Sequence, residues 1–204
     1  MAGLDKRAAT EHTIQELLAI RWSPYAFDSR PVSKADLQSL FEAARWAASS
    51  YNEQPWRYLV ATQEEPEEFA KLLSCLVEPN QVWAKAAPLL AVSVASLNFK
   101  LNNKPNKAAI HDLGLAASSL TLEATARGLA VHQMIGIVPE RVRELYGIPD
   151  GYEAVTALAI GYVGDPQRLP PKLKERDLAP RTRRPLREFV FSGRWGRASG
   201  LIGA

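Results

Sequence analysis

An arginine and a serine near the start of the chain have the types and spacing of an anion-binding pair. Arg21 and Ser23 stand two residues apart in the segment Arg-Trp-Ser-Pro-Tyr-Ala-Phe. A guanidinium group can donate two parallel hydrogen bonds to a phosphate, and a nearby hydroxyl can add another. A second basic group lies far along the chain, at Arg181, Arg183 and Arg184. Ordinary exposed arginines would look the same in either place, so spacing alone leaves the phosphate site open.

A loop rich in hydroxyl and amide groups is the second candidate. Between residues 48 and 57 the chain places donors and acceptors at nearly every position, at Ser49, Ser50, Asn52 and Gln54. Amide side chains present both a donor and an acceptor, which suits the alternating edge of a pyrimidine-like ring. A hydrogen-bonded turn after a helix would use the same residue types. Both interpretations stay open at this level.

The rest of the sequence gives no sign of a built-in catalytic group. Gly136 follows an expected strand, where a missing side chain lets a backbone N–H approach a ligand, but a plain turn explains it equally well. The histidines and the single cysteine lack metal-ligand spacing. His111 and Asp112 are adjacent on an expected helix and are not expected to face each other. No nucleophile elbow or glycine-rich phosphate loop occurs. Redox chemistry on this chain therefore needs a bound cofactor.

The composition is that of an ordinary globular domain. Of the 204 residues, 47% are hydrophobic and 23% are charged, and the net charge is +3. We expect one domain over 1–204, with a core at about 13–164 and a C-terminal arm at about 165–204. The longest mostly apolar run, 86–97, is too short to cross a bilayer, and the N-terminus shows no signal arrangement. A lone cysteine, Cys75, fits a reducing compartment, so we expect a cytoplasmic protein without a membrane partner.

Helical and strand patterns alternate along the chain. The expected helices cover 13–20, 33–47, 66–76, 106–127 and 139–146, and the expected strands cover 57–62, 89–94, 129–134 and 154–163. The strand at 89–94 is apolar apart from Ser93, which predicts a central position in the sheet. Strands separated by helices in this order predict an α+β or α/β layered domain.

The segment after residue 164 has a different character. A basic stretch from Lys172 to Arg187 is followed directly by the aromatic residues Phe189, Phe191 and Trp195. A nucleic-acid partner is not expected, because no aromatic side chains are interleaved with the basic ones. Clustered apolar side chains favour burial. We therefore expect this segment to lie against the core or against a partner subunit.

Taken together, these segments resemble the FMN-dependent nitroreductase family. The resemblance begins at 21–27, runs through 33–46, 49–57, 83–88, 112–114, 128–134 and 159–162, and ends at 183–190. It covers nearly the whole chain from Thr13 to Trp195, and the order of the segments is more specific than any one of them. It implies an α+β fold with a central, mostly antiparallel sheet flanked by helices. It also implies a homodimer that exchanges C-terminal arms and holds two FMN molecules at the subunit interface.

The resemblance also implies a cofactor-binding role for each matched position. These positions are Arg21, Trp22, Ser23, Tyr25, Ser49, Ser50, Asn52, Gln54, Ile135, Gly136, Arg181 and Arg183. The residues at 21–23 and the arginines at 181 and 183 match the phosphate and ring contacts, and the loop at 49–54 matches the one that reaches FMN from the other subunit. The turn at 135–136 matches the backbone that approaches flavin N5. Tyr25 stands where relatives commonly carry a cation, so the flavin potential is expected to be lower unless Lys85 supplies the charge.

The activity implied by the resemblance is that of an FMN-dependent NAD(P)H oxidoreductase. NADH or NADPH would reduce the flavin at N5, and a small acceptor such as a nitroaromatic or a quinone would then reoxidise it. The flavin would carry the chemistry, with no catalytic side chain and no metal. One alternative is another flavin reduction on the same fold, such as dehalogenation or ene reduction. The other is a flavin-binding storage or regulatory module with little turnover, which the missing cation at Tyr25 favours.

Overall fold

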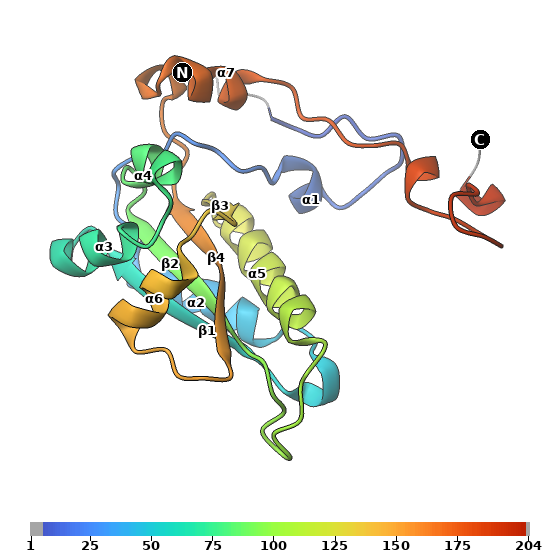
Figure 1. Ribbon diagram of the computed structural model, residues 1–204. Coiled ribbons are helices and arrows are strands. Elements are labelled where there is room, and N and C mark those ends of the chain that lie inside the picture. Colours follow the sequence, from blue (N-terminus) through green and yellow to red (C-terminus); the bar gives the residue numbers. More distant parts are fainter. Residues whose placement is uncertain (1–5, 203–204) are drawn as a thin grey trace.

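The computed structural model describes residues 6–202 and is built around a four-stranded antiparallel sheet (Figure 1). The strands are β1 (Trp56–Thr62), β2 (Leu89–Ser96), β3 (Ala130–Met134) and β4 (Tyr152–Gly161), in the order β1-β2-β4-β3. Every pair of neighbours is antiparallel. The predicted central position of the second strand is confirmed, since β2 pairs on both sides and is buried from Leu89 through Ala95.

Helices cover both faces of the sheet (Figure 1). On one face lie α2 (Lys34–Arg45) and α5 (Ala109–Ala126). On the other lie α3 (Pro66–Leu73), α4 (Glu78–Ala84) and α6 (Pro139–Tyr146). Because successive side chains of a strand point to opposite faces, each strand supplies both cores. The predicted α+β architecture with helices flanking a mostly antiparallel sheet is confirmed.

The two cores divide β2 residue by residue. Leu89 and Ala91 pack with α2 and α5, whereas Leu90 and Val92 pack with the helices of the opposite face. This alternation explains why β2 is apolar at every position except Ser93 and Ser96, because both of its faces are covered. Cys75 has no exposed surface and lies in the core that the sheet forms with α3, α4 and α6.

Local sequence signals explain several helix ends. Ser33 caps α2 by accepting a hydrogen bond from the backbone N–H of Asp36 at 3.0 Å, as the sequence predicts. Gly147 ends α6 in the left-handed conformation, with a φ of 61°. The long helix begins at Ala109, later than predicted, because the side chain of Asn106 accepts a hydrogen bond from the backbone N–H of Ala108 and forms a turn.

Two helices were not predicted from the sequence. The first, α4, follows a turn after Leu73, where the expected helix over 66–76 ends early. The second, α7 (Pro171–Leu178), lies in the segment that was expected to be an extended arm. Both are short and carry a proline in their first turn, where its missing N–H costs nothing.

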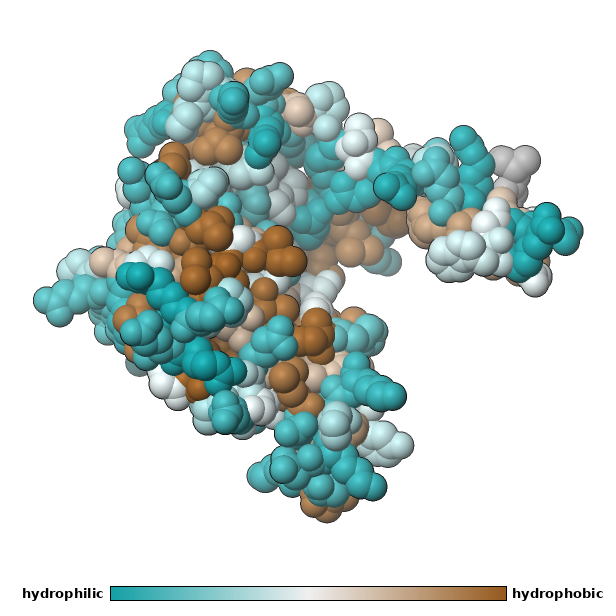
Figure 2. All heavy atoms as spheres, viewed as in Figure 1, coloured by the Kyte–Doolittle hydropathy of each residue, from teal (hydrophilic) through white to brown (hydrophobic). Residues whose placement is uncertain are grey.

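The C-terminal segment leaves the body of the molecule beside the N-terminal segment (Figure 1). Residues 6–15 and α1 (Glu16–Ile20) run along α7 and the arm that follows it. Figure 2 shows this arm projecting from the body above a hollow, with hydrophobic side chains gathered on the body beside it. Phe189 and Trp195 are 58% and 92% exposed. Within one chain they are not buried against the core, which leaves the other alternative, contact with a partner subunit, as a prediction.

Among residues 6–202, no helix combines the length and the apolar character that a membrane span requires.

Candidate functional site

Three arginines that are far apart in sequence lie within electrostatic reach of one another. Arg21 directly follows α1, whereas Arg181 and Arg183 belong to the arm beyond α7. Burial lowers the pKa of Arg21, and the positive charge of Arg183 lowers it further. Burial likewise lowers the pKa of Arg181, with the charges of Arg21 and Arg183 adding to the effect. We call these three side chains the arginine cluster; the structure therefore brings the two predicted phosphate-binding groups together.

The arginine cluster has the chemistry of an anion site. In the part of the chain that the structure describes, no carboxylate forms an ion pair with any of its members. The hydroxyl of Ser23 accepts a hydrogen bond from Arg21 Nη1 at 3.4 Å, which places it beside the cluster. Like charges held together in partly buried surroundings repel one another, and a dianion placed between them reverses the sign of the interaction. The donor set of guanidinium groups and one hydroxyl fits a phosphate monoester.

Arg181 has a different role from the other two arginines. Its Nη1 donates to the backbone carbonyls of Lys6, at 2.7 Å, and Ala19, at 2.6 Å. Arg183 donates only to the neighbouring carbonyl of Thr182 within the described chain. The guanidinium of Arg181 is thus fixed by the protein, and Arg21 and Arg183 are left with more donors for a ligand.

The segment after Arg21 is anchored through its backbone. The buried carboxylate of Asp177, on α7, accepts hydrogen bonds from the N–H of Tyr25 at 2.8 Å and of Ala26 at 3.2 Å. Lys6 Nζ lies 5.1 Å from the ring centroid of Trp22. Neither Asp177 nor Lys6 was singled out from the sequence, because both look like ordinary charged surface residues there.

The ring of Tyr25 lies in an aromatic cluster. Its centroid is 5.1 Å from that of Trp83 and 4.6 Å from that of His132. His132 donates from Nδ1 to the carbonyl of Pro24 at 2.8 Å, since a carbonyl can only accept. Burial lowers the pKa of His132. Lys85, the possible replacement for the missing cation, lines a cavity that also includes Trp83.

The Ser49–Gln54 loop has a strained backbone. Tyr51, Asn52 and Gln54 have φ values of 53°, 55° and 53°, in the left-handed region that residues other than glycine seldom adopt. The loop is a hydrogen-bonded turn, in which the N–H of Gln54 donates to Ser49 Oγ at 3.1 Å. A simple turn requires fewer than three residues in the left-handed conformation. Because backbone strain of this kind concentrates at functional sites, it favours a binding role for the loop.

A buried carboxylate on α5 holds this loop. Asp112 Oδ2 accepts a hydrogen bond from the N–H of Ser50 at 2.9 Å, and Asp112 is only 3% exposed. Asp112 Oδ1 lies 3.0 Å from His111 Nδ1, so the expectation that these neighbours do not meet is wrong. The His111 side chain is 71% exposed, and at the helix surface it can adopt a rotamer that turns its ring toward the neighbouring carboxylate. In the sequence, the signal for a buried role of Asp112 is its position as an acidic residue on the otherwise apolar side of the helix.

The Ile135–Gly136 turn directly follows β3. Ile135 is 87% exposed. The carbonyl of Gly136 accepts hydrogen bonds from the N–H of Val77 at 3.1 Å and from Asn80 Nδ2 at 3.0 Å. A Cβ at position 136 would lie 2.4 Å from Asn80 Nδ2 and 2.8 Å from Val77 Cγ2. The close approach to α4 therefore requires glycine here, and it fixes the turn that presents Ile135 to solvent.

One chain does not bring all the predicted residues together. In Figure 1 the loop that follows α2, drawn in cyan, lies at the lower end of α5, whereas α1 and the arm lie at the opposite end of the molecule. The Ser49–Gln54 loop is thus remote from the arginine cluster of the same chain. A single site that uses both needs a second copy of the chain.

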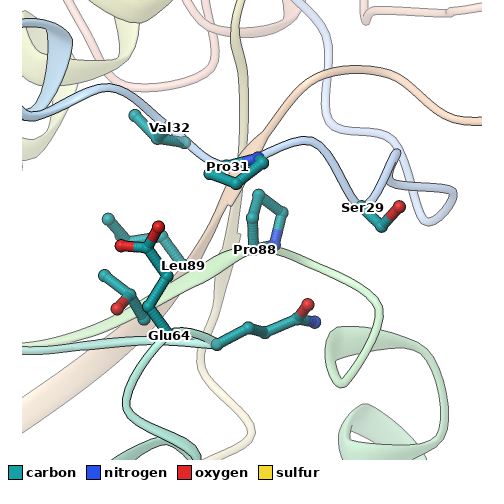
Figure 3. A pocket seen from close by; sticks show the side chains of 8 residues that line it. Ser29, Pro31, Val32, Glu64, Pro88 and Leu89 are labelled. Atoms are coloured by element: carbon teal, nitrogen blue, oxygen red, sulfur yellow. The ribbon is translucent and has the colours of Figure 1, made fainter.

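The pocket in Figure 3 is separate from these residues. It has a volume of about 140 Å³ and lies where β1 ends and β2 begins. Ser29, Pro31, Glu64 and Pro88 are among the side chains around it, and none of the predicted site residues lines it.

Comparison with known proteins identifies the family. The Nitroreductase family matches residues 18–162, so this chain belongs to the nitroreductase family. A crystal structure described as an oxidoreductase containing FMN is similar over 96% of this chain and 98% of its own, with 35% identity and a TM-score of 0.87. A nitroreductase family protein from Clostridium difficile 630 is similar over 90% of this chain and 99% of its own, with 26% identity and a TM-score of 0.69.

A sequence relative belongs to the same comparison. A protein of Stenotrophomonas maltophilia (strain K279a) with the provisional name NADH dehydrogenase/NAD(P)H nitroreductase is 30% identical over 166 residues. The match covers 72% of this chain and 83% of that protein. The resemblance stated from the sequence is confirmed at the level of family and fold.

Proposed function

We propose that this protein is an FMN-dependent NAD(P)H oxidoreductase that reduces small acceptors such as nitroaromatics or quinones. The observation that carries the proposal is the arginine cluster beside Ser23, assembled from two ends of the chain and without a described carboxylate partner. The similar structure described as containing FMN and the provisional name of the Stenotrophomonas relative support it. When bound, FMN supplies the hydride and electron transfer between nicotinamide and acceptor.

The chain's own residues bind and orient the cofactor. Arg21, Arg183 and the hydroxyl of Ser23 bind the phosphate, and Arg181 holds the N-terminal segment in place through its two backbone contacts. Each charged contact of a phosphate in a partly screened site contributes on the order of a few kcal/mol. We assign no general acid to these positions.

The loop and the turn complete the site. We assign Ser49, Ser50, Asn52 and Gln54 to the ring of an FMN bound by the other subunit, because these residues lie remote from the arginine cluster of their own chain. The Ile135–Gly136 turn, which is fixed by its contacts with Val77 and Asn80, would supply backbone groups to the bound ring. Tyr25 acts through packing, since its ring contacts Trp83 and His132 and carries no positive charge.

A homodimer follows from this division of the site. Phe189 and Trp195 on the arm are largely exposed in the single chain. Apolar side chains are also partly exposed on neighbouring helices, at 45% for Leu18 on α1 and 44% for Ile110 on α5. Large exposed apolar surface on a soluble chain marks an interface. A second copy would cover these side chains and bring its Ser49–Gln54 loop to the cluster.

Equilibrium titration of the apoprotein with FMN tests the phosphate assignment. Arg21→Ala and Arg183→Ala are each expected to weaken FMN binding by about 10- to 100-fold, because each removes a charge-assisted contact. Arg187→Ala is the matched control, because it removes the same charge from the arm outside the cluster. Wild-type affinity in both cluster variants would overturn the assignment.

A further inference from the structure

The carboxylate of Asp177 is buried, and the binding of FMN as described so far does not use it. It is 2% exposed, and its two oxygens accept hydrogen bonds from the N–H groups of Tyr25 and Ala26, at 2.8 and 3.2 Å. Burial raises the pKa of Asp177, which means that the fold disfavours its charged form. Burying a carboxylate is unfavourable unless hydrogen bonds and charges compensate. The two hydrogen bonds from the backbone compensate in part for the burial of this carboxylate, and they indicate that its role is to hold the backbone at Tyr25 and Ala26.

Further contacts join α7 and the arm to the N-terminal part of the chain. Lys6, itself only 8% exposed, donates from Nζ to the carbonyl of Asp177 at 2.7 Å and to that of Ala179. Arg181 donates in return to the carbonyls of Lys6 and Ala19. Residues 6, 19–26 and 177–181 thus form one hydrogen-bonded unit, which we call the clasp. It connects the arm with the segment that contains Arg21.

The clasp brackets the arginine cluster on both sides. Arg21 lies between two positions that the clasp holds, Ala19 and Tyr25. Arg181 is itself part of the clasp, and Arg183 follows two residues later. The positive charges of the three arginines act on one another, and like charges favour separation of the two segments. The hydrogen bonds of the clasp oppose that separation.

We propose that Asp177 is a positioning residue for phosphate recognition. By holding the backbone at Tyr25 and Ala26 against α7, it keeps Arg21 and Ser23 aligned with the arginines of the arm. This inference rests on the proposed FMN site and deepens it, because it assigns the selectivity of that site for a phosphorylated flavin to a residue that does not touch the phosphate.

A purely structural role for Asp177 makes a different prediction. General loosening of the fold weakens the binding of any flavin, because the ring contacts are lost together with the phosphate contacts. Misalignment of the arginine cluster weakens only the binding of the phosphate. Riboflavin has the same ring system as FMN but lacks the phosphate. The ratio of the two dissociation constants therefore separates positioning from general stability.

The experiment is a titration of the full-length apoprotein with FMN and with riboflavin. We expect the wild-type protein to prefer FMN. In Asp177→Ala we expect this preference to fall about tenfold or more, with the riboflavin dissociation constant changed by less than about threefold. Asp177→Asn is expected to fall in between, because its amide oxygen can still accept one of the two N–H groups. Glu175→Gln, an exposed change on the same helix, is the matched control and should keep the full preference.

The outcomes distinguish this inference from the proposed function. A wild-type protein that binds neither flavin would overturn both. A wild-type preference for FMN that stays unchanged in both Asp177 variants would overturn the positioning role and leave the FMN site standing. Equal weakening of FMN and riboflavin would also overturn it, in favour of a purely structural role. If the alanine variant does not fold, Asp177→Asn, which keeps the size of the side chain, decides by the same ratio.

Discussion

The carboxylate of Asp112 on α5 accepts a hydrogen bond from the backbone N–H of Ser50 at 2.9 Å. This contact ties the long helix to a loop in which Tyr51, Asn52 and Gln54 all have left-handed backbone conformations. Such conformations cost on the order of 1–3 kcal/mol each and persist only where the surroundings enforce them. Asp112 is therefore part of what holds the loop in the shape that we assign to flavin binding.

Replacing Asp112 by alanine should release this loop. We expect the free energy of unfolding to fall by about 1–3 kcal/mol, because the N–H of Ser50 loses its partner. FMN binding should weaken as well. Urea denaturation and FMN titration measure the two effects. Lys107→Ala, at an exposed position just before α5, is the control and should change stability by less than about 0.5 kcal/mol. Unchanged FMN affinity in Asp112→Ala would contradict the role of the loop.

Adding a methyl group at Gly136 should disturb the turn after β3. The new Cβ would lie 2.8 Å from Val77 Cγ2 and 2.4 Å from Asn80 Nδ2, which itself holds the carbonyl of Gly136. We expect Gly136→Ala to cost about 1–3 kcal/mol of stability through overpacking. Gly114→Ala is the control: nothing lies within 4 Å of the new Cβ, and it sits inside α5. It should stabilise by up to about 1 kcal/mol. Equal stability changes would argue against a fixed turn.

His132 should make the stability depend on pH. Burial lowers the pKa of its imidazole below the ordinary 6.5, although the carbonyl of Pro24 and the charge of Asp177 act in the opposite direction. The folded protein thus disfavours the protonated ring, whereas the unfolded chain takes up a proton as the pH falls through 6.5. The contribution of His132 to stability is complete above that pH and is lost as the pH falls toward the folded pKa.

The measurement is the free energy of unfolding between about pH 8 and pH 5, by urea denaturation. His132→Asn keeps a donor for the carbonyl of Pro24 but does not titrate, so we expect its pH dependence to be flatter. His12→Asn, at an exposed position, should keep the wild-type slope. Parallel slopes for the wild type and His132→Asn would show that another group is responsible.

The exposed aromatic residues of the arm should contribute to dimer stability. Trp195, at 92% exposed, is the stronger candidate, and its ring packs on that of Phe191 at 5.2 Å between centroids. Central aromatic residues of an interface commonly contribute 2 kcal/mol or more, so Trp195→Ser should raise the dimer dissociation constant by about 30-fold. Sedimentation velocity over a range of concentrations measures it. Leu145→Ser is the control, because α6 lies on the side of the body away from the arm (Figure 1). A wild-type protein that is monomeric with full FMN occupancy would contradict the shared site.

Much of the body of the fold could be predicted because its signals are local. The apolar run from Leu89 and the cap at Ser33 each depend on a few neighbouring residues, and both predictions are confirmed. The helix α7 was missed because its sequence is mostly charged and resembles an exposed arm. Its only fully buried side chain is that of a charged residue, Asp177.

The site was less predictable than the fold. Spacing suggested anion binding at Arg21 and at Arg183 separately, but only the folded chain shows that the two arginines act on each other. The anchors Asp112 and Asp177 have partners 62 and 151–152 residues away. Contacts between residues so far apart cannot be predicted from the pattern of neighbouring residues in the sequence. The assignment of the individual cofactor-binding residues remains a prediction that the flavin titrations test.

The most direct test of the central claim is the visible absorption spectrum of the purified protein, recorded anaerobically before and after NADH and then NADPH. We predict bound flavin whose absorption bleaches with at least one nicotinamide and returns when a nitroaromatic or a quinone is added. Flavin that stays oxidised with both donors would contradict the oxidoreductase assignment and favour storage or another donor. A protein that binds no flavin, even after incubation with FMN, would contradict the cofactor site itself.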